Sequence, residues 1–437
     1  MGSTLPSKSG KFSIRTIMMV SGERLPVLLN KTEGIPLFDP TVYVLTELRQ
    51  KNRASNTIER ALREIEVLLD FLDASDIHLD KRLQTGQLLS LPEIDGLVRH
   101  CGLPASEFKA SRSRLTQETP RQSLRVIRME RFRMRRPSTY AKEVSPVTVA
   151  NRIRTIRAYL TWLSARHLSQ PNLDPTIRIT LVSTKEFVLN AMFERIPSTR
   201  GRNTVGMREG ASPETLDRLL KVIGPCSPEN PWLSPHAQAR NSLAISWLLL
   251  LGLRRGELLN VKISDIDFQK EVVTIARRAD DPQDPRRKQP RTKTRDRRIP
   301  LSPELAAATH HYIITIRSTL DGARLHEFLF VADRSGVPMA LDTLNRVFHT
   351  LRVTFPDLPE DLTPHILRHS WNDKFSEIME KKGVPPEEEK KLRSFLMGWV
   401  ETSDTALSYT RRHTRKKGQE VSLEIQANML KGNNDKE

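Results

Sequence analysis

The segment TPHILRH occupies residues 363–369 and is the part of the chain around which the other motifs are arranged. Thr363 is a typical N-cap and Pro364 a typical first helical residue, so this segment predicts the start of a helix. His365 and Arg368 are three residues apart, which places both side chains on one face. The N–H groups of a helix N-terminus also favour an anion. Although a lone His-x-x-Arg pair is most often plain helix surface, we expect a phosphate site here.

Residues on either side of this segment complete a chemically coherent set. The segment GLRRGEL at 252–258 follows an apolar run. Its Arg254 can donate two parallel hydrogen bonds to a phosphate, and Glu257 can orient that guanidinium. A surface Arg–Glu pair of little energetic value is the alternative interpretation. Downstream, Trp399 offers an indole donor and Tyr409 a phenol. Together these residues indicate nucleophilic attack on a phosphodiester without a metal or cofactor.

Five ordered motifs resemble those of the tyrosine recombinases, the phage-integrase family. They are Gly-Leu-Arg254-x-Gly-Glu257-Leu, Thr-Lys293-Thr, His365-x-Leu-Arg368-His369, Gly398-Trp399 and Tyr409. The resemblance covers residues 212–415, with a looser match before that. It implies a mainly α-helical fold with a small β-hairpin or sheet in the catalytic domain.

The resemblance also implies a role for each motif. Arg254 and Arg368 clamp the phosphate, and His365 accepts the proton of the tyrosine or hydrogen-bonds the phosphate. Trp399 stands where many family members carry a second histidine. Cre-type recombinases are similar to this chain in having a tryptophan there. An indole N–H can donate to a phosphate oxygen but cannot exchange a proton.

Tyr409 is the implied nucleophile. Its attack gives a 3′-phosphotyrosyl DNA and a free 5′ hydroxyl, and surrounding cations favour its phenolate. Lys293 protonates the departing 5′ oxygen in this scheme, and Lys288 is the alternative lysine. A lysine on a solvated loop with no such role is the remaining interpretation of Lys293.

Composition favours a polyanionic partner. The chain has 437 residues with Lys+Arg 70 and Asp+Glu 52, a net charge of +18, and nucleic acid is the commonest partner of such proteins. Cys101 and Cys226 lie far apart without metal-ligand spacing, which fits a reducing cytosol without disulfides or zinc. There is no signal-peptide core and no apolar run of transmembrane length. We therefore expect a cytoplasmic, nucleoid-associated protein.

The predicted organisation has five parts. Residues 1–34 form an N-terminal extension with a possible hairpin, and 35–196 a helical core-binding domain that contacts DNA. A linker at 197–211, rich in Gly and polar residues, precedes the catalytic domain at 212–415. The tail at 416–437 is amphipathic. It either docks onto a neighbouring protomer, as the resemblance implies, or packs on its own domain.

Two arginine-rich stretches are candidate DNA contacts. The first lies between residues 121 and 136, and the second is a helix that begins at Ser145-Pro146, with an apolar stripe and arginines largely off it. Both can track phosphates, and for the first a solvated charge run is the alternative. The candidate DNA-binding residues are Arg121, Arg125, Arg128, Arg152, Arg154 and Arg157.

The predicted function is that of a site-specific DNA recombinase of the integrase or transposase type. Its predicted partners are double-stranded DNA and three further copies of the chain, which together form a homo-tetramer on two DNA sites. Other recombinase or accessory subunits can join this assembly. A non-cleaving DNA-binding accessory protein with a recombinase fold is the alternative, favoured by a Trp399-to-Tyr409 spacing one residue longer than usual. A type IB topoisomerase, which relaxes supercoils without a specific site, is the third.

Overall fold

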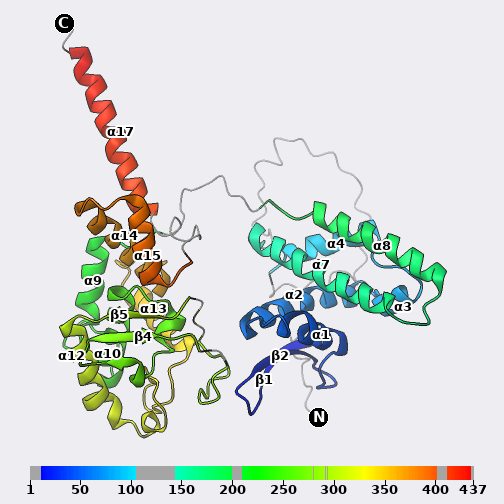
Figure 1. The fold of residues 1–437 in the computed structure, drawn as a ribbon, viewed down its shortest axis with the longest axis horizontal. Helices are drawn as coiled ribbons and strands as arrows, with labels where there is room; N and C mark the ends of the chain where they lie inside the picture. Colours follow the sequence, from blue (N-terminus) through cyan, green and yellow to red (C-terminus); the bar gives the residue numbers. More distant parts are fainter. Residues whose placement is uncertain are drawn as a thin grey trace, which may run out of the picture. The chain divides into compact units, whose positions relative to one another are not determined.

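A computed structural model describes residues 11–104, 143–198, 209–278, 280–290, 292, 294–400 and 411–434. The chain divides into two compact units. We call them the N-terminal unit, Met1–Met19 with Arg24–Thr204, and the C-terminal unit, Val20–Glu23 with Val205–Glu437. Helices dominate both, and each contains one small sheet, so the predicted mainly α fold is confirmed (Figure 1).

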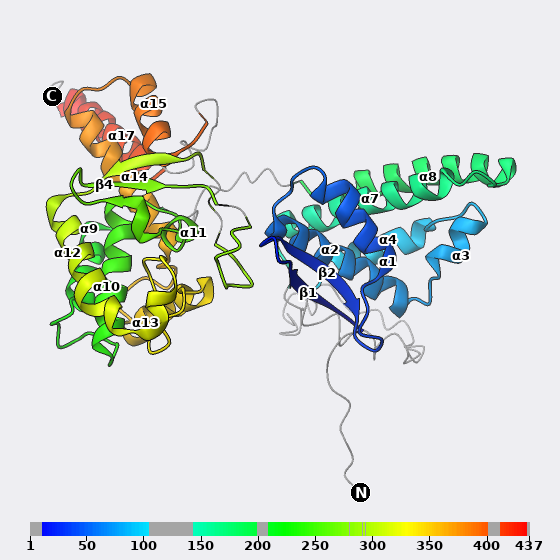
Figure 2. The same ribbon diagram turned by 60° about the horizontal axis from the view of Figure 1, so that its bottom comes forward.

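The N-terminal unit begins with a hairpin. Strand β1 (Phe12–Met18) pairs antiparallel with β2 (Arg24–Asn30), in a register from Phe12 opposite Asn30 to Met18 opposite Arg24. Every residue of β2 is buried, because this strand packs against helix α2 (Ser55–Ala74) (Figure 2). The hairpin is therefore part of the core of this unit.

Helices form the rest of the N-terminal unit. In helix α7, the predicted N-cap Ser145 accepts a hydrogen bond from the Thr148 N–H at 3.3 Å. The predicted apolar stripe of α7 faces the core, with Ile153, Ile156 and Leu160 fully buried. Besides α2, the elements are α1 (Phe38–Tyr43), the π-helical η1 (Val44–Arg49), α3 (Leu79–Gln84), α4 (Leu91–Gly102), α7 (Pro146–Leu168) and α8 (Pro175–Glu194).

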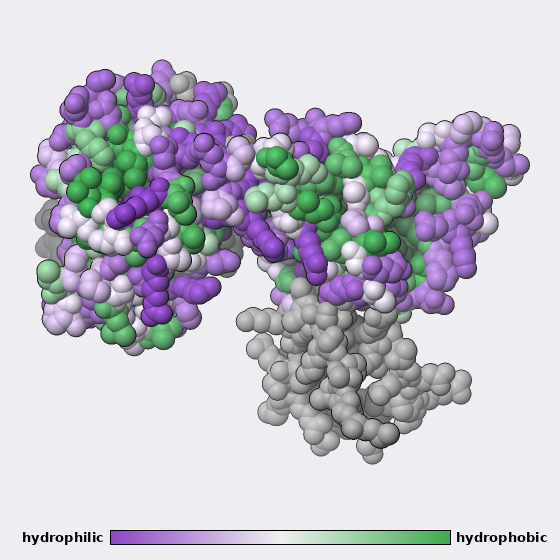
Figure 3. All heavy atoms as spheres, turned by 90° about the horizontal axis from the view of Figure 1, so that it is seen from below, coloured by the Kyte–Doolittle hydropathy of each residue, from purple (hydrophilic) through white to green (hydrophobic). Residues whose placement is uncertain are grey.

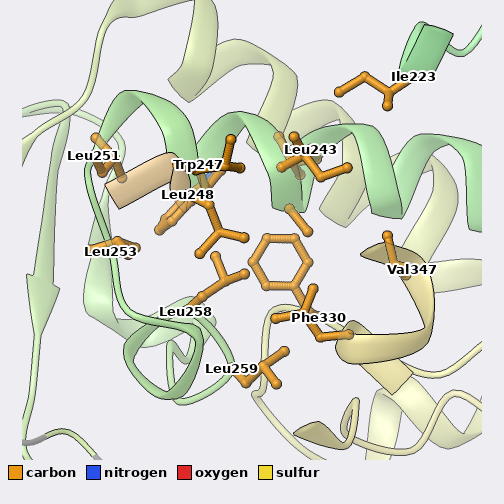
Figure 4. Packing of buried hydrophobic residues seen from close by; sticks show 14 of the residues in the cluster. Ile223, Leu243, Trp247, Leu248, Leu251, Leu253, Leu258, Leu259, Phe330 and Val347 are labelled. Atoms are coloured by element: carbon orange, nitrogen blue, oxygen red, sulfur yellow. The ribbon is translucent and has the colours of Figure 1, made fainter. Parts of the chain in front are cut away.

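The C-terminal unit surrounds a second core. Trp247 of helix α10 lies at its centre with leucines of the same helix and Phe330, and its indole N–H donates to Thr309 Oγ1 at 3.0 Å (Figure 4). The helices before and after the sheet are α9 (Pro213–Ile223), α10 (Pro235–Leu250), α11 (Arg255–Leu258), α12 (Pro303–His311), α13 (Leu341–Thr354), α14 (Pro364–Lys381), α15 (Pro386–Met397) and α17 (Arg411–Asn434). Single-turn elements η2 (Ile263–Asp265), η3 (Tyr312–Ile316), η4 (Arg317–Thr319) and η5 (Asp321–Leu325) connect them.

The sheet of the C-terminal unit has the antiparallel order β3 (Ile266–Asp267), β4 (Val272–Ile275) and β5 (Arg297–Pro300). The β4–β5 connection returns onto the body of the unit. There Arg286, paired with Asp284, donates to the Leu259 and Met339 carbonyls at 3.0 and 2.9 Å, and both charged side chains are buried. The β4–β5 connection is therefore anchored from its middle.

Segments near the predicted linker and tail pack on helix α14. The Ala211 N–H donates to Ser370 Oγ at 2.8 Å. Helix α17 forms an ion pair between Lys417 and Glu380 at 2.5 Å, while Val421 and Ile425 of its predicted apolar stripe remain exposed. Near Lys417 the helix packs on its own domain. The exposed Val421 and Ile425 are the residues that docking onto a neighbouring protomer would use.

Figure 3 shows one face of the molecule, where polar residues predominate and apolar residues gather in separate patches. Within the described residues, no helix is long and apolar enough to span a bilayer.

Candidate active site

The candidate site is built around one buried carboxylate, Glu257 of the short helix α11. Its Oε1 accepts from Thr294 Oγ1 at 2.7 Å and from Arg254 Nη1 at 3.2 Å. Its Oε2 accepts from Arg297 Nη2 at 2.8 Å and from the Arg254 backbone N–H at 3.1 Å, and lies 3.7 Å from Arg368 Nη1. Glu257 is only 1% exposed. One side chain therefore connects three of the predicted motifs.

The electrostatics of this cluster favour an anion. Burial by itself would raise the pKa of Glu257, but the guanidinium groups of Arg297, Arg368 and Arg254 lower it to about 2. The carboxylate is therefore ionised at neutral pH. Because arginine stays protonated, three positive charges surround one negative charge and the cluster carries 3 − 1 = +2. A phosphate is a suitable counterion for such an excess.

The backbone before Arg254 is shaped by Gly252. Gly252 has φ +60°, and a Cβ there would lie 2.9 Å from the Trp371 ring, so only glycine fits without strain. Its carbonyl accepts from Arg368 Nη1 at 2.5 Å. Arg254 follows as the N-cap of α11, with its side chain 23% exposed. Glu257 thus contacts both predicted clamp arginines. Arg368 also bonds to the Gly252 carbonyl, two residues before Arg254 in the chain.

Helix α14 begins at Pro364, as the sequence predicts. Thr363 occupies the N-cap position, as predicted, although its side chain makes no capping hydrogen bond. His365 is exposed, whereas Arg368 is fully buried. The two side chains thus differ in exposure, although they lie one helical turn apart in α14. The His365 ring instead packs edge-on against His369, with centroids 4.7 Å apart.

Gly398 and Trp399 follow helix α15 and close over Arg368. Gly398 ends the helix with φ +66°, and a Cβ there would meet the Arg295 carbonyl at 2.9 Å. The Trp399 ring centroid lies 5.3 Å from the Arg368 guanidinium carbon, a cation–π distance, and Trp399 is 7% exposed. The fourth motif is thereby brought to the same cluster.

Arg297 is the site residue that sequence reasoning missed. Its side chain is 3% exposed and contacts Glu257 directly. A signal was present in strand β5, where burial alternates with Arg297 and Ile299 inward and Arg298 outward. Arg297 shares the inward face with an apolar residue, and a charged side chain there requires a partner.

Lys293 and Tyr409 lie outside the described residues, as do Arg121, Arg125 and Arg128. The alternative lysine, Lys288, is exposed. The structure therefore brings together Arg254, Glu257, Arg368 and Trp399, with His365 one helical turn before Arg368.

The structure differs from expectation among the arginines of α7. Arg152 is buried, and its Nη1 donates to the Cys101 and Leu103 carbonyls, each at 2.7 Å, at the C-terminal end of α4. Its guanidinium is therefore used within the fold, because unbonded carbonyls at a helix end attract a cation. Arg154 is exposed. Arg157 is half-buried, with Nε donating to the Leu189 carbonyl at 2.9 Å.

The sequence profile of the Phage integrase family matches residues 219–416. None of the curated proteins matches the chain.

Several solved structures are similar to this one. The XerA recombinase is 20% identical with a TM-score of 0.34, over 59% of this chain and 77% of that one. The Tn1549 transposon integrase in complex with circular intermediate DNA is 18% identical with a TM-score of 0.38, over 74% and 98%. The lambda integrase dimer bound to a COC′ core site is 14% identical with a TM-score of 0.33, over 90% and 94%. Residues 219–416 of this chain are thus similar in sequence to the phage integrase family.

Proposed function

We propose that this protein is a site-specific DNA recombinase that cuts and rejoins DNA through a 3′-phosphotyrosyl intermediate. The observation that carries the proposal is the cluster of Arg254, Arg297 and Arg368 around the single carboxylate of Glu257. Its excess charge of +2 suits the additional negative charge that a phosphodiester develops when it is attacked. The match of residues 219–416 to the phage integrase family supports the same reaction class.

Arg254 and Arg368 act on the non-bridging oxygens of the scissile phosphate. The guanidinium of Arg254 is oriented by Glu257 and partly exposed, so it can donate to a docked phosphate directly. Arg368 has no exposed surface here. We infer that it reaches the phosphate only once DNA binding rearranges the side chains that cover it. Trp399, in contact with Arg368, supplies an indole donor from the same side.

Tyr409 carries out the covalent step. Its phenolic oxygen attacks phosphorus, the bond from phosphorus to the 5′ oxygen breaks, and Lys293 donates the proton that this oxygen takes up. The exposed His365 accepts the phenolic proton or hydrogen-bonds the phosphate. The phosphotyrosyl ester retains the bond energy, so a 5′ hydroxyl from a second strand can reverse the step without ATP.

Double-stranded DNA is the proposed partner, and the net charge of +18 supports it. Arg154 and the arginines of 121–136 are the proposed contacts in the N-terminal unit. The active form is a homo-tetramer on two DNA sites, because exchange between two duplexes requires four cleavages.

Covalent trapping tests the proposal. The full chain is incubated with nicked duplexes from the ends of its own genetic element and separated on a denaturing gel. We expect a protein–DNA adduct that maps to Tyr409 by peptide sequencing. Tyr409→Phe should abolish the adduct and leave binding in a native gel unchanged, because only one oxygen is removed.

Other outcomes separate the alternatives. Specific binding without an adduct across these duplexes would favour the non-cleaving accessory protein. Adducts on any sequence, together with relaxation of supercoiled plasmid, would favour a type IB topoisomerase. An adduct retained in Tyr409→Phe would show that another residue is the nucleophile.

A further inference from the structure

The guanidinium of Arg297 uses all three of its nitrogens within the candidate site. Nη2 donates to Glu257 Oε2 at 2.8 Å, Nη1 to Thr294 Oγ1 at 3.0 Å, and Nε to the Leu396 carbonyl at 2.7 Å. Thr294 in turn donates to the other oxygen of Glu257 at 2.7 Å. Arg297 and Thr294 thereby hold both oxygens of that carboxylate.

The third contact joins this carboxylate to a distant part of the chain. Leu396 lies in the last turn of α15, two residues before Gly398. The Arg295 N–H donates to the Gly398 carbonyl at 3.0 Å, so strand β5 and its approach hold the backbone on both sides of that turn. Trp399, which contacts Arg368, follows immediately.

We propose that Arg297 is a positioning residue for the DNA cleavage reaction, an inference that rests on the proposed recombinase function. It holds the Glu257 carboxylate that orients the Arg254 guanidinium, and at the same time it fixes the backbone that places Trp399 against Arg368. Arg297 does not touch the phosphate. It sets the distance between the Arg254 side of the site and the Trp399 side.

Only an arginine satisfies these three acceptors together. They lie in different directions around one planar group, and a guanidinium presents donors along its whole edge. A lysine ammonium is a single point and can reach Glu257 or the Leu396 carbonyl, but not every acceptor at once. Arg297→Lys therefore keeps the charge and loses the geometry, which separates the two contributions.

The experiment measures the single-turnover rate of adduct formation on a nicked duplex, the Kd for the same DNA, and the thermal unfolding of the full chain. In Arg297→Gln we expect a cleavage rate lower by about 100-fold, the effect of displacing a reacting group by about 1 Å, with Kd within about threefold of wild type. The cleavage rate of Arg297→Lys should lie between those of Arg297→Gln and wild type. Arg298→Gln, an equal charge change on the exposed face of β5, is the matched control and should cleave at the wild-type rate.

A double-mutant cycle identifies the route of the effect. Glu257→Gln and Arg297→Gln both break the Arg297–Glu257 contact, so the loss of rate in the double variant should be smaller than the product of the two single losses. Effects that multiply would show that Arg297 acts independently of Glu257 and would overturn the proposal. So would an Arg297→Gln protein that is folded and cleaves at the wild-type rate, or one whose Kd rises in step with its loss of cleavage.

Thr294 provides a second route if Arg297→Gln does not fold. Thr294→Val removes one acceptor of Arg297 and one donor to Glu257 with little change of shape. We expect cleavage slower by at least about tenfold, because two hydrogen bonds to charged groups are lost, and recovery in Thr294→Ser. Wild-type cleavage by Thr294→Val would overturn the proposal. A wild-type protein that binds DNA but forms no adduct would contradict the recombinase function itself, an outcome distinct from all of these.

Discussion

Two buried arginines, one in each unit, show two uses of the same side chain. Arg152 in the N-terminal unit donates to the carbonyls of Cys101 and Leu103, both at the end of α4. Arg297 in the C-terminal unit donates to a carboxylate that also contacts Arg254 and Arg368. The first arrangement stabilises one helix end. The second sets the geometry of several side chains at once, so its loss should affect chemistry more than folding.

The pKa shifts follow this difference. Burial lowers the pKa of Arg152, and burial with Arg152 nearby lowers the pKa of His100 to about 4. Charge in this part of the N-terminal unit is therefore disfavoured. At Glu257 burial acts in the opposite direction from the surrounding arginines, and the arginines prevail. A buried carboxylate that remains ionised holds its arginines in place over the whole neutral range.

The largest effect should come from the clamp arginines themselves. Arg254→Ala or Arg368→Ala should lower the rate of adduct formation by about 10²–10³-fold, the usual result of losing one donor to transition-state charge. The Kd for DNA should change by a few-fold only, because one phosphate contact among many is lost. Single-turnover cleavage and a binding titration measure the two quantities.

Arg255→Ala is the matched control, because Arg255 adjoins Arg254 but points to Asn345 with Nη1 3.0 Å from Oδ1. It should cleave at the wild-type rate. Equal losses of cleavage and binding in Arg254→Ala would indicate a structural role for Arg254 and remove the contrast with Arg152.

A smaller effect is expected in acid. Glu257 has a pKa of about 2 in the folded protein against an ordinary 4.5, so its ionisation stabilises the fold fully above pH 4.5 and this contribution is lost as pH falls toward 2. The difference of 4.5 − 2 = 2.5 pH units corresponds to about 3 kcal/mol. Glu257→Gln should therefore be less stable than wild type at neutral pH, and the gap should close below pH 4.5.

Urea unfolding of both proteins between pH 7 and pH 3 measures this gap. A constant difference in unfolding free energy over that range would show that the carboxylate is not held ionised by its arginines. The contrast in pKa between Arg152 and Glu257 would then not hold.

The smallest effect should be that of the α7 arginines. Arg152→Ala leaves two carbonyls without their charged donor and should lower the unfolding free energy of the N-terminal unit by about 2 kcal/mol. Arg154 lies two residues further along the same helix and is exposed. Arg154→Ala should leave the unfolding free energy unchanged and weaken DNA binding, with the slope of log K against log salt concentration smaller by about 1. Chemical unfolding and salt-dependent binding titrations distinguish them, and the reverse pattern would show that Arg152 faces DNA.

Helix starts and strand pairs were within reach of the sequence because their causes are local. Pro146 and Pro364 each open a helix as predicted, since a proline lacks only an N–H that is unbonded in the first turn anyway. The small sheet expected from the resemblance is also present, with the strands at 272–275 and 297–300 paired antiparallel.

The orientation of individual arginines was not predictable in the same way. Arg152 and Arg154 look alike in the sequence, and a rotation of the helix by a fraction of a turn decides which one is buried. Helical spacing placed His365 and Arg368 on one face but could not show that only the second is covered. These outcomes depend on what packs against the helix.

The sequence by itself determined the identity and the order of the motifs, because residue types and their spacing carry both. Only the tertiary structure decided that Glu257 is the centre of the site and that Arg297 belongs to it. Arg297 bonds to Glu257 across 40 residues of chain and to Leu396 across 99. Hydrogen bonds act over about 3 Å, so partners this far apart in sequence are paired only by the folded backbone that brings them together.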